Sequence, residues 1–140
     1  MSRSFPSAGR LLASAALFSL AVVPGSIGAQ TAPAVQSISA KDKETGAKAH
    51  PELVAEFGGA ETGTQAAYVE AVGKNIAVQS GLSNAKGDFT VTLLNSPVNN
   101  AFAVPGGYIY TTRQLVALMN NEAELAAVLG HEVGHVAARH

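Results

Sequence analysis

Residues 122–140 have the sequence EAELAAVLGHEVGHVAARH, and this stretch decides the fold class. The acidic residues Glu122 and Glu124 follow two asparagines, at positions 120 and 121, either of which can cap a helix. Apolar residues then recur at helical spacing, with no proline among them. They are Leu125, Val128, Leu129, Val133 and Val136. The pattern predicts a helix with one buried face.

The predicted helix carries the pentapeptide HEVGH, with His131, Glu132 and His135. At about 100° per residue, the two histidines lie about 40° apart and one turn from each other. Two imidazoles so placed can bind one Zn²⁺ at about 2.0–2.1 Å. Glu132 lies beside the metal, where its carboxylate can accept a proton from a zinc-activated water. The alternative interpretation is a pair of solvent-facing histidines on an ordinary amphipathic helix.

Shorter elements are predicted upstream of this helix. Pro105-Gly106 suits the central positions of a type II turn in a hairpin. The expected elements are a short helix from 51 to 57, a helix over 64–79, a strand over 88–94, hairpin arms over 101–104 and 108–111, and a short helix over 113–119. His50 is interpreted as a solvated residue at a helix start. Tyr108 and Tyr110 share one strand face, which favours packing over catalysis.

The first thirty residues predict export. Arg3 and Arg10 precede an uncharged run over 11–23, and Pro24-Gly25 then breaks it. This is the layout of a secretory signal peptide, with cleavage expected after Ala29. A membrane anchor is the alternative, but a span needs about 20 apolar residues and this run is shorter. We therefore expect a signal peptide over 1–29 and an irregular linker over 30–48.

Composition excludes several classes of function. Nine Lys and Arg residues against ten Asp and Glu leave no concentrated basic face, so we expect no nucleic acid partner. The absence of cysteine excludes disulfides, thiol catalysis, cysteine zinc sites and a lipid anchor on an N-terminal cysteine. We therefore expect no stable membrane anchor.

Three motifs together resemble a known family. HEVGHVAARH, preceded by NNEAELAAVLG and by NAFAVPGGYIYTT, is similar to the M48 zinc metallopeptidases of the HtpX type, the CAAX-prenyl-protease type and the bacterial periplasmic branch. The resemblance implies an α+β, zincin-like fold in which the HExxH helix packs on a small mixed sheet. Residues 49–140 would form the N-terminal part of such a domain, incomplete at its C-terminus.

The resemblance also assigns roles to residues. It implies that His131 and His135 bind one Zn²⁺ per chain and that Glu132 is the catalytic base. It implies an extended substrate beside an edge strand. The candidate residues of that strand are Asn100, Ala101, Phe102 and Ala103. The resemblance implies a third ligand, a glutamate, beyond residue 140. His140 is not expected to replace it, because His140 lies about 180° around the helix from His131.

The expected function is that of an exported, periplasmic zinc metalloendopeptidase that hydrolyses peptide bonds by metal-activated water. The resemblance implies polypeptide substrates, namely misfolded or stalled envelope proteins. With two of three ligands, the 140-residue segment alone is expected to be inactive. If the chain ends at His140, the alternative is a non-catalytic exported binding or chaperone-like module.

Overall fold

Three short strands form the sheet in the computed structural model, which describes residues 37–82 and 84–139. The strand order is β1-β3-β2, with β1 (Thr90–Leu94) parallel to β3 (Tyr108–Thr112). β2 (Ala101–Val104) is antiparallel to β3 and has no neighbour on its other side among the described strands. β2 is therefore an edge strand. The predicted signal peptide, the first part of the predicted linker and His140 lie outside the described residues.

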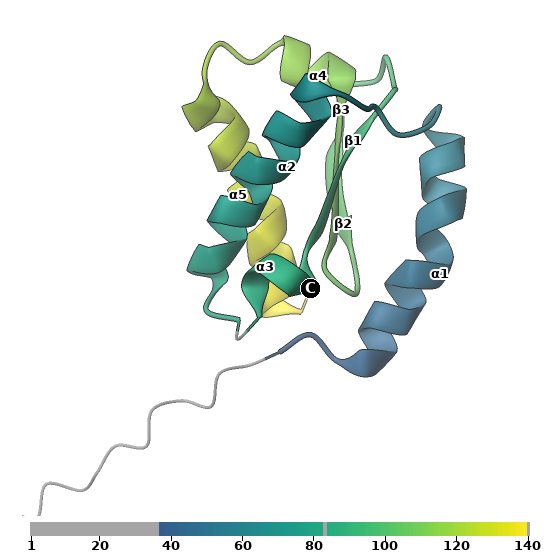
Figure 1. Cartoon of the computed structure of the whole chain (residues 1–140), viewed down its shortest axis with the longest axis vertical. Coiled ribbons are helices and arrows are strands. Elements are labelled where there is room, and N and C mark those ends of the chain that lie inside the picture. Colours follow the sequence, from purple (N-terminus) through teal and green to yellow (C-terminus); the bar gives the residue numbers. More distant parts are fainter. Residues whose placement is uncertain (1–36, 83, 140) are drawn as a thin grey trace, which may run out of the picture. The chain divides into compact units, whose positions relative to one another are not determined.

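Helices cover both faces of this sheet (Figure 1). α2 (Thr64–Ala77) and α5 (Glu122–Ala138) lie on one face, and α1 (Ala40–Glu56) lies on the other. The short helices η1 (Val78–Ser80), α3 (Ala85–Asp88) and α4 (Arg113–Ala117) connect these elements. The chain is thus a mixed α+β protein with a small mixed sheet, as the sequence predicted.

The hydrophobic core fills the space between the sheet and the pair α2 and α5. Because side chains alternate along a strand, Val91, Leu93 and Ile109 point into this core. From the helices, the core receives Val69, Val72, Leu125, Leu129 and Val133. Three of the five predicted apolar residues of the last helix, Leu125, Leu129 and Val133, are therefore buried, and Val128 and Val136 are half-buried.

α1 corrects the prediction of an irregular linker up to residue 48. The helix begins after Ser39, whose side chain accepts a hydrogen bond from the Asp42 N–H at 3.0 Å. It continues through Pro51, where a helix start was expected. Alanine, lysine and glutamate are strong helix formers, so the composition of residues 40–48 allows a helix without an apolar period. The period is missing because α1 buries only Gly46.

The predicted hairpin and its turn are confirmed. β2 has the predicted bounds, β3 extends one residue further, and Gly106 has a φ of +100°, which only glycine adopts readily. The strand predicted over 88–94 begins two residues late, since Asp88 ends α3 and pairs with Lys43 at 2.6 Å. None of the described helices is long and apolar enough to cross a membrane.

Candidate active site

α5 begins after a single cap residue, Asn121. The Asn121 side chain accepts from the Glu124 N–H at 3.0 Å, and the Asn120 N–H donates to the Glu124 carboxylate at 2.8 Å. The first bond satisfies an N–H group that the first helical turn leaves without a partner, and it confirms the predicted cap. The helix ends at Arg139, the C-cap residue, whose φ is +59°. The whole HEVGH segment is therefore helical.

The two histidines of this segment converge. The Nε2 atoms of His131 and His135 lie 2.9 Å apart, and the ring planes cross at 89°. Two nitrogens on a tetrahedral zinc, each at about 2.0–2.1 Å, are about 3.3 Å apart. Small side-chain rotations would widen the distance between the two Nε2 atoms from 2.9 Å to this value. Imidazole nitrogens are preferred zinc ligands, so this pair fits the metal both in chemistry and in spacing.

Glu132 lies on the inner side of the same helix. It is 9% exposed, on the face that also buries Leu129 and Val133. No Lys or Arg among the described residues forms an ion pair with its carboxylate. Its burial beside Leu129 and Val133 restricts the positions that this carboxylate can take. Such a group is available for proton transfer.

The donor set is incomplete within the described residues. Among residues 37–82 and 84–139, no group of three or more His, Cys, Asp or Glu side chains could hold a metal ion. Catalytic zinc sites use three protein ligands. The structure therefore brings together His131 and His135, with Glu132 beside them in the helix, and supplies no third ligand from its described part.

The candidate substrate strand coincides with the edge strand. Ala101, Phe102 and Ala103 lie in β2, and Asn100 precedes it, donating its N–H to Thr112 Oγ1 at 3.2 Å. Ala103 packs against the core that α5 helps to form. All four β2 residues are half-buried. The edge strand and the HEVGH helix thus border the same hydrophobic core.

His50 corrects the interpretation of a solvated residue at a helix start. It lies in the middle of α1, half-buried, with Nδ1 2.8 Å from the hydroxyl oxygen of Tyr110. Burial, together with the nearby Tyr108, raises the pKa of Tyr110 to about 12. The Tyr110 hydroxyl therefore stays protonated and can donate to Nδ1. The packing role predicted for both tyrosines is confirmed, but His50 was missed because its helix was missed.

Comparisons with known proteins identify a family and several relatives of this chain. The model of peptidase family M48 matches residues 63–140, which is more than half of the chain. The chain is 40% identical over 73 residues to mitochondrial metalloendopeptidase OMA1 of Schizosaccharomyces pombe, a segment that covers 52% of this chain and 21% of the relative. It is 38% identical over 68 residues to the protein of the same name in Arabidopsis thaliana, covering 48% of this chain and 14% of the relative.

A bacterial protein is also similar. The beta-barrel assembly-enhancing protease of Escherichia coli (strain K12) is 34% identical over 73 residues. The match covers 52% of this chain and 15% of that protein. The similarity to all three relatives is therefore confined to a minor part of their length.

Proposed function

The chain belongs to peptidase family M48, and from this premise we propose that it is a zinc-dependent endopeptidase that hydrolyses peptide bonds in polypeptides. One observation carries the proposal: the Nε2 atoms of His131 and His135 converge to 2.9 Å on one face of α5. The names of the relatives, metalloendopeptidase and protease, support a metal-dependent peptidase.

In this proposal His131 and His135 hold the zinc ion. A third ligand, expected to be a glutamate, comes from outside the described residues. Zn²⁺, when bound, supplies Lewis acidity that makes a hydroxide nucleophile available near neutral pH. The fold expected around such a site is zincin-like, and the packing of α5 against the sheet is compatible with it.

Glu132 acts as the general base. It takes a proton from the attacking water and gives it to the leaving amine nitrogen, so that one carboxylate serves both halves of the reaction. Its position next to His131 in the helix and its 9% exposure support this role, because packing fixes the direction of the carboxylate. No described lysine or arginine competes for the negative charge.

The substrate is an extended polypeptide that adds to the open side of β2. Backbone hydrogen bonds to an edge strand accept almost any sequence, with side-chain pockets adding preference. The candidate residues for this pairing are Asn100, Ala101, Phe102 and Ala103. Only an unfolded segment can be added in this way, which favours misfolded or stalled proteins as substrates.

We place the protein outside the cytoplasmic membrane. The signal-like layout of residues 1–29 supports export, and the name of the bacterial relative, a beta-barrel assembly-enhancing protease, supports a role in envelope protein quality control. The compartment in this proposal is the periplasm.

Metal analysis of the full-length protein tests the proposal. We expect about one zinc per chain, loss of peptide hydrolysis on chelation, and recovery when zinc is added back. His131→Ala and His135→Ala should each abolish zinc retention. Full hydrolysis by a zinc-free protein would contradict the metal mechanism. A protein that binds unfolded polypeptides with neither zinc nor hydrolysis would be a non-catalytic binding module instead.

A further inference from the structure

Stacked rings cross the face of the sheet that α1 covers. The ring centroids of Phe57 and Phe102 are 5.2 Å apart, and those of Phe102 and Tyr110 are 4.8 Å apart with planes at 21°. His50 continues the series, with its centroid 5.7 Å from Tyr110 and 5.1 Å from Tyr108. These distances are within the range of favourable aromatic pairs. We call these five residues the aromatic brace.

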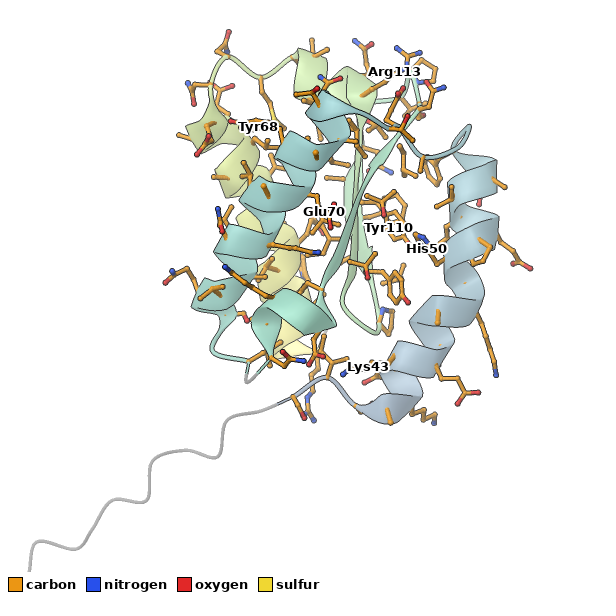
Figure 2. All side chains as sticks on the ribbon, viewed as in Figure 1. Lys43, His50, Tyr68, Glu70, Tyr110 and Arg113 are labelled. Carbon is orange, nitrogen blue, oxygen red and sulfur yellow. The ribbon has the colours of Figure 1, made fainter. Side chains whose placement is uncertain are left out.

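Tyr110 is the centre of the brace. Its side chain is fully buried, and its hydroxyl lies 2.8 Å from Nδ1 of His50. Figure 2 shows the two side chains directed toward each other, one from α1 and one from the sheet. A buried hydroxyl requires a partner, so this hydrogen bond ties α1 to the sheet. Tyr110 is also the cross-strand partner of Phe102.

β2 contributes one ring, that of Phe102, to this brace. It has four residues, and β3 is its only neighbour among the described strands. Toward the layer of α2 and α5 it presents only Ala101 and Ala103, whose side chains are single methyl groups. On the opposite face, the Phe102 ring lies between the rings of Tyr110 and Phe57, with centroid distances of 4.8 Å and 5.2 Å. Phe102 is therefore the large side chain through which the edge strand packs on the face that α1 covers.

We infer that the aromatic brace positions β2 for substrate binding, with His50, Phe57 and Tyr110 as positioning residues that do not touch the substrate. The inference rests on the proposed function, in which a polypeptide pairs with β2. A strand that is already ordered binds a partner without a further loss of chain entropy. Loss of the brace should therefore weaken the binding of substrates that pair with β2 and leave the chemical step unchanged.

The test compares two substrates on the full-length, zinc-loaded enzyme. One is a quenched ten-residue peptide, long enough to pair with β2, and the other is its four-residue core around the cleaved bond. For Phe57→Leu and His50→Leu we expect KM for the long peptide to rise about two- to tenfold, with kcat and zinc content unchanged. KM for the short peptide should not change. A merely structural role would affect both peptides equally.

Two further variants sharpen the comparison. His50→Asn places an amide oxygen near the position of Nδ1, so its KM for the long peptide should rise less than that of His50→Leu. Glu52→Gln, an exposed position on α1, is the matched control and should behave as the unmodified enzyme. If His50→Leu does not fold, Phe57→Leu alone decides, because Phe57 is half-buried just after α1.

Two outcomes are kept apart by this design. Suppose that the unmodified enzyme binds zinc and is active, and that Phe57→Leu leaves KM for the long peptide unchanged. This result overturns the inference and not the proposed function. Equal losses of kcat for both peptides overturn it as well. An unmodified protein without zinc or hydrolysis instead contradicts the proposed function, and peptide affinity measured directly on Phe57→Leu then decides whether the brace orders β2.

Discussion

Replacing Gly46 by alanine is expected to destabilise the protein, although alanine is the better helix former. A Cβ atom at Gly46 would lie 2.3 Å from the carbonyl oxygen of Pro105 and 2.5 Å from Cδ2 of Tyr108. The approach is close from the other side as well, because a Cβ on Gly106 would lie 2.5 Å from the carbonyl oxygen of Asp42. α1 and the turn are thus in direct backbone contact.

The magnitude follows from two opposing effects. Alanine in place of glycine gains about 1 kcal/mol of helix propensity. Relief of the clash requires a shift of about 1 Å, and overpacking of this kind costs about 1–3 kcal/mol. The same shift would stretch the 2.6 Å ion pair of Lys43 with Asp88 and the 2.8 Å hydrogen bond of His50 with Tyr110. We expect a net loss of about 1 kcal/mol in the free energy of unfolding.

Urea unfolding at equilibrium measures this change. The matched control is Ala47→Gly, one residue further along α1 and exposed, which should cost about 1 kcal/mol through propensity alone. If Gly46→Ala instead raised stability by as much as Ala47→Gly lowers it, the close contact between α1 and the hairpin turn would not exist in solution. The argument for the aromatic brace would then lose its support from α1.

Three further predictions concern other parts of the chain. Burial raises the pKa of Tyr110 from 10.0 to about 12, so its hydroxyl contributes stability that is fully present below pH 10 and is lost as the pH rises through about 12. Ultraviolet titration of the three tyrosines should therefore show one group that ionises late. Ionisation of all three near pH 10 in the folded state would contradict this. Thr111 Oγ1 is buried with no hydrogen-bond partner in the described part of the chain, so Thr111→Val should leave the free energy of unfolding unchanged or raise it by up to about 1 kcal/mol. A decrease of more than about 1 kcal/mol would reveal a partner. Mass spectrometry of a periplasmic fraction should find an N-terminus near Gln30, and an intact Met1 in the membrane pellet would show an anchor instead.

Local signals made parts of the fold predictable. The cap at Asn121 and the turn at Pro105-Gly106 depend on interactions within a few residues, and both were located from the sequence. The spacing of His131 and His135 likewise depends only on helix geometry, so the convergence of their Nε2 atoms followed from the helix.

α1 could not be predicted in the same way. It buries only Gly46, so it carries no apolar period, and its contacts join residues far apart in sequence, such as His50 and Tyr110. The role of His50 follows only once α1 lies against β3. No local pattern contains that information.

Glu132→Gln, made in the full-length protein, tests the central claim most directly. The substitution keeps the shape of the side chain and removes the base, so zinc should remain bound while peptide hydrolysis falls by at least about a hundredfold. Glu52→Gln, at an exposed position on α1, serves as the matched control and should keep its activity. A Glu132→Gln protein that retains both zinc and full hydrolysis would show that Glu132 is not the base and would contradict the proposed mechanism.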